Sequence, residues 1–178
     1  MPRNIQQLLH EGEISAQQRF DERQRWQSER GQQALDQMFK TYLDTNAINF
    51  IKQQHYFFIA TADGSGECDC SFRGTEPDLE GNKQPAIIVR DEHTLVFPDY
   101  TGNYIYNSLG NMLDNPHIGI LFIDFINATR FRVNGSVNIV EDKTAYQQHW
   151  ATALRYVEVT VKQAYANCSK RIQQSVQL

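Results

Sequence analysis

The residues best suited to chemistry lie in a glycine loop followed by a predicted helix. Gly102 can adopt positive φ, and Asn107 or Ser108 can cap a helix whose apolar side includes Leu109 and Met112. A glycine loop before a capped helix start presents free backbone N–H groups and the positive end of the helix dipole. Both features suit an anion such as a phosphate group, so this stretch predicts an anion-binding site.

Other reactive side chains do not combine into a recognisable site. Cys68 and Cys70 form a C-x-C pair on one face of a predicted strand, but a metal site needs two more ligands, which no paired Cys or His motif supplies. Four histidines are scattered, at His55, His93, His117 and His149. No Ser/His/Asp or paired-carboxylate arrangement is visible. We therefore predict no metal site, and the sequence identifies no catalytic residue.

Composition and charge argue against several classes of protein. A net charge of −4 and a pI of about 5.7 do not fit a general nucleic-acid binder, which neutralises phosphates with a basic face. No apolar run reaches the roughly 18 residues of a membrane span, and the segment MPRNIQQLLHEGE lacks the apolar core of a signal peptide. We expect a cytoplasmic protein without nucleic-acid or membrane partners. Its three cysteines are expected to be reduced, with no structural disulfide.

The elements that position the loop begin with a helical segment over residues 1–52. Ser15 followed by Gln18 resembles a capping box and predicts a helix over residues 15–31, with so few apolar positions that it forms an arm packed on something else. An apolar stripe at helical spacing follows, at Ala34, Leu35, Met38, Phe39, Tyr42 and Leu43. A further short helix passes through Ile48 and Ile51. We expect these two helices to cover a sheet.

From residue 53 to residue 178 the pattern predicts a second, mainly β domain. The predicted strands cover residues 56–62, 67–72, 86–90, 94–97, 117–124, 129–140 and 156–161. Pro98 is expected to stop the fourth strand, Gly135 to mark a bulge, and Asp142 to cap a helix through Trp150. Short connections favour antiparallel pairing, because parallel strands require long crossovers. An antiparallel barrel is the expected architecture.

Several motifs follow one another in the order of a known family. The segments FFIATAD, CSFRG, LVFPDYTGN, SLGNMLDNPHIGILFID and FRVNG resemble the pyridoxamine 5′-phosphate oxidase-related family of FMN-binding split barrels. The segments LHEGEISAQQRF and YANCSKRIQ resemble the flanks of the barrel in its flavin-nucleotide-binding members. The resemblance implies a six-stranded antiparallel split β-barrel with flanking helices and a helical N-terminal arm. It also implies a homodimer that holds FMN non-covalently in clefts at the subunit interface.

The same resemblance implies a set of FMN-binding residues. Arg73 would contact the phosphate or ribityl group, Gly102 and Asn103 correspond to the family's GN loop, and Ser108 supplies a hydroxyl at the helix start. Backbone near Pro98 would adjoin the ribityl chain or isoalloxazine ring, and the tail would fold back toward the cleft. The full implied set is Ser71, Arg73, Pro98, Asp99, Gly102, Asn103, Ser108, Lys170 and Arg171.

The chain departs from the family pattern where positive charge is expected. Many relatives have two arginines directly after the GN pair, where this chain has Tyr104 and Ile105, and residues 106–108 read Tyr-Asn-Ser instead of the oxidases' Ser-Arg-Lys. Either Arg73 and the tail cations compensate, or flavin affinity is low. The C-terminal arginine and tryptophan segment that grips pyridoxal substrates is replaced by IQQSVQL. We therefore do not expect oxidation of pyridoxamine phosphate.

Three functional hypotheses remain open at this point. The first is an FMN-dependent oxidoreductase that acts on a small molecule, with NADH or NADPH as a candidate electron donor; the flavin supplies the redox chemistry and the protein supplies orientation. The second is a non-catalytic flavin carrier. The third is a dimeric scaffold that binds haem or deazaflavin F420 instead of FMN. The substrate and the physiological electron donor are not indicated by the sequence.

Overall fold

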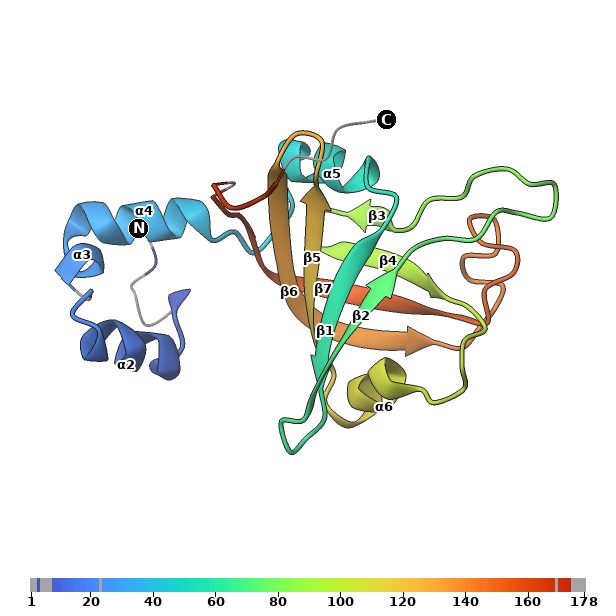
Figure 1. Cartoon of the computed structure of the whole chain (residues 1–178), viewed down its shortest axis with the longest axis horizontal. Coiled ribbons are helices and arrows are strands. Elements are labelled where there is room, and N and C mark those ends of the chain that lie inside the picture. The colour runs from blue at the N-terminus through green and yellow to red at the C-terminus, as the bar shows by residue number, and fades with distance from the viewer. Residues whose placement is uncertain (1–2, 4–7, 23, 169, 174–178) are drawn as a thin grey trace. The chain divides into compact units, whose positions relative to one another are not determined.

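The protein consists of two compact units, Met1–Lys40 and Thr41–Leu178. The computed structural model describes residue 3 and residues 8–22, 24–168 and 170–173. Figure 1 labels the elements of both units.

The first unit is helical and has a small core of its own. Its helices are α2 (Glu11–Arg19), α3 (Gln24–Gln27) and α4 (Glu29–Met38). Leu8, Leu9 and Leu35 are buried, with Ile14, Trp26 and Phe39 packed against them.

The predicted start and end of the first helix are wrong. The capping box lies earlier than expected: the His10 side chain accepts a hydrogen bond from the Gly12 N–H, and the Glu13 carboxylate accepts one from the His10 N–H. Ser15 is inside α2. The helix ends at Arg19 with Phe20 as its C-cap, and Asp21 follows with φ 59°.

The second unit is built on one sheet of seven antiparallel strands. They are β1 (Phe57–Ala62), β2 (Cys68–Arg73), β3 (Ile88–Asp91), β4 (Thr94–Asp99), β5 (His117–Asp124), β6 (Thr129–Val140) and β7 (Arg155–Ala166). Their order is β2-β1-β5-β6-β7-β4-β3. The implied six-stranded barrel is thus corrected to an open sheet of seven strands, because the short segment β3 pairs with β4 and forms one of the edges.

The sheet curls back on itself, as Figure 1 shows. β1 and β4 are not neighbours in the sheet, yet the ring centroids of Phe57 on β1 and Phe97 on β4 are 5.3 Å apart. Phe122 on β5 packs on the same Phe57 ring at 5.6 Å. The concave side therefore encloses the main hydrophobic core and brings β2 close to β4.

Two helices of this unit pack on the core. α5 (Thr45–Lys52) buries Ala47 and Ile51, and α6 (Asn107–Asp114) buries Leu109 and Met112. In Figure 1 the two helices lie at opposite ends of the curled sheet. α6 thereby places its N-terminus beside the segment that leaves β4.

The N-cap of α5 provides a test of how this helix is held on the sheet. The Asp44 side chain caps α5 by accepting a hydrogen bond from the Ala47 N–H at 2.9 Å. Asp44→Ala is expected to lower the free energy of unfolding by about 1 kcal/mol, the usual contribution of an N-cap. Urea denaturation measures the change. Asp44→Asn retains the cap and serves as the control; an equal loss in both variants would contradict this role.

Three local predictions have clear outcomes. The register shift between Asn134 and Gly135 confirms the bulge; a Cβ at Gly135 would lie only 2.3 Å from the Thr160 carbonyl oxygen. β4 continues through Pro98 to Asp99, contrary to prediction, because β3 pairs only with residues 94–96 and needs no N–H from Pro98. Residues 143–149 form turns instead of the predicted helix.

Candidate functional site

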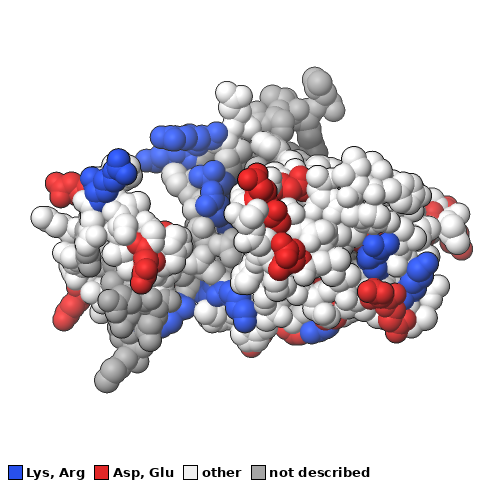
Figure 2. Space-filling view, turned by 90° about the horizontal axis from the view of Figure 1, so that it is seen from below, with Lys and Arg blue, Asp and Glu red and all other residues white. Residues whose placement is uncertain are grey.

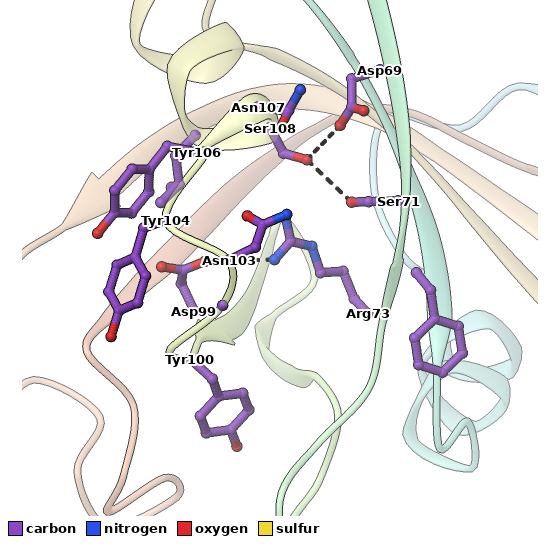
Figure 3. A pocket seen from close by; sticks show the side chains of 13 residues that line it. Asp69, Ser71, Arg73, Asp99, Tyr100, Asn103, Tyr104, Tyr106, Asn107 and Ser108 are labelled. Carbon is purple, nitrogen blue, oxygen red and sulfur yellow. Dashed lines mark hydrogen bonds and ion pairs between the residues drawn. The ribbon is translucent and has the colours of Figure 1, made fainter.

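A cavity of about 400 Å³ opens between β2, the end of β4 and the start of α6. It is lined by Asp69, Ser71, Phe72, Arg73, Asp99, Tyr100, Gly102, Asn103, Tyr104, Tyr106, Asn107, Ser108 and Leu109. Figure 3 shows these side chains around the opening. β2 and β4 lie far apart in the order of the sheet, so the cavity exists only because the sheet curls.

Strand β2 contributes a row of polar side chains to the cavity. Asp69, Ser71 and Arg73 alternate with the exposed residues between them, so all three point to one face. The Ser108 hydroxyl donates to Asp69 Oδ2 at 2.8 Å, and the Ser71 and Ser108 oxygens are 3.1 Å apart. A hydroxyl has a single proton, so Ser71 is the donor in the second contact. Figure 3 shows this chain of hydrogen bonds.

A buried carboxylate lies between two arginines at the end of β4. Asp99 Oδ1 is 3.5 Å from Arg73 Nη1, and Asp99 Oδ2 is 3.6 Å from Arg155 Nε. The side chain of Asp99 is only 9% exposed. Burial raises the pKa of Asp99, and the two positive charges oppose this shift without cancelling it. The group joins three strands, because Arg73, Asp99 and Arg155 come from β2, β4 and β7.

The loop between β4 and α6 contains two tyrosines in a left-handed backbone conformation. Tyr104 and Tyr106 both have φ 62°, whereas Gly102, expected to supply the positive φ, does not adopt it. A left-handed conformation is uncommon for residues other than glycine and is concentrated at functional sites. Asn103 supports the turn by accepting a hydrogen bond from the Ile105 N–H at 3.1 Å.

The N-terminus of α6 has no side-chain cap. Tyr106 occupies the N-cap position and makes no capping hydrogen bond, so the predicted cap by Asn107 or Ser108 is wrong. Ser108 is the second residue of the helix and is buried, with its proton directed to Asp69. The first N–H groups of a helix have no partner within the helix. Those of α6 therefore face the cavity with donor capacity for a ligand.

Arg73 also has donor capacity. Its Nε atom is buried and has no hydrogen-bond partner among the described residues. An unsatisfied buried donor is costly, and in native structures it calls for an explanation such as a bound ligand. With the uncapped start of α6, it forms a set of donors suited to a phosphate or carboxylate group.

Six of the nine residues expected at the site line this cavity. They are Ser71, Arg73, Asp99, Gly102, Asn103 and Ser108. Pro98 is buried in β4 and does not line the cavity. Lys170 and Arg171 do not line it either, and both are exposed in the tail. The structure of one chain thus brings the β2, β4 and loop residues together but not the tail cations.

Sequence reasoning missed several residues of the cavity wall. Asp69 could have been found from strand alternation, since it is two residues before Ser71 and four before Arg73. Tyr100, Tyr104 and Tyr106 had no recognisable signal, because aromatic residues in a loop resemble ordinary surface residues. The Tyr100 hydroxyl lies 3.2 Å from Thr75 Oγ1, and burial raises its pKa.

The described residues contain neither a metal-binding cluster nor a membrane-spanning helix. Within residues 8–22, 24–168 and 170–173, together with residue 3, no three His, Cys, Asp or Glu side chains could hold a metal ion. The helices in the same part of the chain are too short or too polar to cross a membrane. Figure 2 shows one face of the molecule, on which basic and acidic side chains are interspersed.

Comparisons with known proteins agree with this architecture. The family described as pyridoxamine 5′-phosphate oxidase matches residues 43–168. HupZ of Group A Streptococcus is 16% identical with a TM-score of 0.54, over 75% of this chain and 98% of HupZ. A Lactobacillus delbrueckii protein named for pyridoxamine 5′-phosphate oxidase is 17% identical with a TM-score of 0.55, over 71% of this chain and 95% of its own. At such identities the likeness concerns the fold alone. No curated protein matches the chain.

Proposed function

The chain belongs to the pyridoxamine 5′-phosphate oxidase family, and on this premise we propose that it binds FMN in the cavity between β2 and β4 and acts as an FMN-dependent oxidoreductase on a small molecule. One observation carries the proposal. Arg73, whose buried Nε has no partner among the described residues, lines the same cavity as the uncapped first turn of α6, and together they suit the phosphate of a flavin nucleotide.

The residues of the cavity divide into an anionic-ligand end and an aromatic wall. Arg73 and the first N–H groups of α6 would hold the phosphate, and Ser71 could turn its hydroxyl from Ser108 toward a phosphate oxygen. Tyr100, Tyr104 and Tyr106 offer ring surface for packing against planar groups. A bound flavin would supply electron and hydride transfer, while these side chains orient it and exclude water on one side.

A flavin carrier is the second candidate, and one observation favours it. The cavity wall contains two carboxylates, Asp69 and Asp99, against the single cation Arg73. This balance weakens attraction for a phosphate and would permit release of the ligand. NADPH or NADH distinguishes the candidates: an oxidoreductase loses its flavin colour within seconds to minutes of mixing, whereas a carrier stays yellow on that timescale.

An absorption spectrum of the purified protein, followed by titration with FMN, tests the proposal. We expect bands near roughly 375 and 450 nm, or a shift of those bands and a change of flavin fluorescence on addition of FMN. A protein that leaves the spectrum and fluorescence of FMN unchanged would overturn the proposal, and haem or F420 would then be titrated in the same way.

We further propose that the protein is a homodimer and that the partner closes the cavity. Tyr56, Phe58 and Phe72 form a cluster of aromatic rings on β1 and β2, with the Tyr56 and Phe72 centroids 5.4 Å apart. Phe72 is 60% exposed, and its side chain points to the face of β2 opposite that of its neighbours Ser71 and Arg73, which line the cavity. A partner that covered this cluster would therefore lie against the strand that forms one wall of the cavity.

Light scattering at micromolar concentration tests the dimer. The unaltered chain is expected to have the mass of two chains, and Phe72→Ser to shift toward the mass of one, because it removes exposed aromatic area from the proposed interface. Leu79→Ser is the matched control, since Leu79 is 86% exposed on a loop away from the cluster. A monomeric unaltered chain, or an equal shift in both variants, would contradict this proposal.

A further inference from the structure

The loop after β4 lacks the cations that a phosphate site requires. Residues 100–108 read YTGNYIYNS, so none carries a positive charge. Among the residues that the structure describes, Arg73 is the only cation of the cavity wall, and it is opposed by Asp69 and Asp99. A phosphate monoester carries between one and two negative charges near neutral pH. Holding it in this cavity would call for another cation from outside the loop.

We propose that Arg155 is this second cation and that it selects the phosphorylated form of the ligand. The inference rests on the proposed function, because it concerns the same cavity. Arg155 is the first residue of β7 and lies 47 residues after Ser108, the last residue of the loop. It does not belong to the implied ligand set, and it is not among the residues that line the cavity. In the folded structure it contacts two of them, Asp99 and Tyr106.

Asp99 places Arg155 opposite Arg73. Each arginine approaches Asp99 through one nitrogen, at 3.5 Å from Arg73 Nη1 and at 3.6 Å from Arg155 Nε. A guanidinium group has five N–H donors. The terminal nitrogens of Arg155 have no hydrogen bond to any described residue, so they are available to a ligand. Asp99 thus acts as a positioning residue for two cations that approach it from different strands.

Tyr106 holds Arg155 from the other side. The Cζ atom of Arg155 lies 5.5 Å from the centroid of the Tyr106 ring, within the range of a cation–π contact. The ring takes this position from a backbone with φ 62°, which is unfavourable for tyrosine. The contact gives a physical reason for the strained conformation. It also leaves the side chain of Arg155 only 27% exposed, which limits the entropy lost on binding a ligand.

Two arginines that share one carboxylate suit a phosphate better than a neutral group. Arginine binds phosphate through paired N–H donors, and two such groups can engage different oxygens of one phosphate. Riboflavin has the ring and ribityl chain of FMN without the phosphate. We therefore expect that removing Arg155 lowers the affinity for FMN and leaves the affinity for riboflavin unchanged.

The test compares Arg155→Gln with Arg132→Gln. Arg132 is an arginine on β6 that contacts Tyr165, which does not line the cavity, whereas Arg155 contacts the lining residues Asp99 and Tyr106. Isothermal titration with FMN and riboflavin should show an approximately tenfold loss of FMN affinity for Arg155→Gln, with riboflavin affinity unchanged. Arg132→Gln should match the unaltered chain for both ligands. Arg155→Lys, which keeps the charge without the paired donors, should fall between them.

A second measurement separates failure of this inference from failure of the proposed function. Inorganic phosphate should raise the thermal midpoint of the unaltered chain and of Arg132→Gln, but not that of Arg155→Gln. If the unaltered chain binds phosphate but not FMN, the proposed function fails while the anion site stands. If Arg155→Gln binds FMN and phosphate as the unaltered chain does, or loses FMN and riboflavin equally, the assignment of Arg155 is overturned.

Discussion

Arg73→Gln is expected to bind FMN about 10- to 150-fold more weakly than the unaltered chain, because a hydrogen bond to a charged group contributes about 1.5–3 kcal/mol. The reason lies in the position of the side chain. Arg73 is 22% exposed, its Nε has no partner, and its Nη1 already faces Asp99. Glutamine keeps a polar group of similar reach but loses the charge and the paired donors. Fluorescence titration of FMN measures the change.

The fold should tolerate this substitution, which makes the affinity change interpretable. Asp99 retains Arg155 as a partner, so no buried charge is left without a cation. We expect similar circular dichroism spectra and thermal midpoints for both proteins, and similar riboflavin affinities. Asp69→Asn is the informative companion: it removes a carboxylate from the same cavity face and should strengthen FMN binding. An Arg73→Gln protein with unaltered FMN affinity would remove Arg73 from the site.

The strands could be predicted well from sequence because their burial patterns are local. Residues 117–124 are mostly apolar and residues 129–140 alternate in part, with a bulge at Gly135, and both predicted ranges coincide with β5 and β6. β4 was predicted too short because proline usually ends a strand, whereas this proline lies where no second neighbour needs its N–H. The pairing that decided the outcome involves β3, which was predicted as a strand over residues 86–90 but whose register on β4 is set by the fold.

The site was partly predictable, and the missing part has a common cause. Arg73 and the loop residues could be named because they lie in short motifs. Arg155 could not, since it approaches Asp99 only after β7 has paired beside β4. The hydrogen-bond partner of Ser108 could not be predicted either. As a helix-start hydroxyl it resembled a cap, but Asp69, brought near by the curl of the sheet, accepts its proton instead.

The structure of the segment between β6 and β7 could not be predicted from local sequence either. Asp142 and the aromatic residues after it resemble a capped helix, and Asp142 does accept a hydrogen bond from the Thr144 N–H at 2.9 Å. The chain nevertheless forms successive turns. Trp150 and Tyr156 insert into a second hydrophobic cluster with Val96 and Ala153, and this tertiary packing prevails over local helix preference.

Trp150→Ala is accordingly expected to lower the free energy of unfolding by about 3–5 kcal/mol, the usual cost of removing a buried aromatic side chain. Trp150 is fully buried, its ring centroid lies 5.9 Å from that of Tyr156, and its Nε1 donates to the Pro85 carbonyl at 2.6 Å. The side chain thus joins the turns to the long loop before β3. Urea denaturation followed by circular dichroism measures the loss.

Trp150→Phe separates packing from hydrogen bonding in this cluster. Phenylalanine keeps much of the ring volume but leaves the Pro85 carbonyl without its donor, so we expect a smaller loss of about 1–3 kcal/mol. The segment also leads to the site: the Leu154 N–H donates to the Asp99 carbonyl at 2.9 Å, and Arg155 follows directly. Trp150→Ala should therefore weaken FMN binding under conditions where the protein remains folded, and Trp150→Phe should do so less. Full stability in Trp150→Ala would show that these turns are held by their own hydrogen bonds. The position of Arg155 would then depend on its contacts with Asp99 and Tyr106 alone.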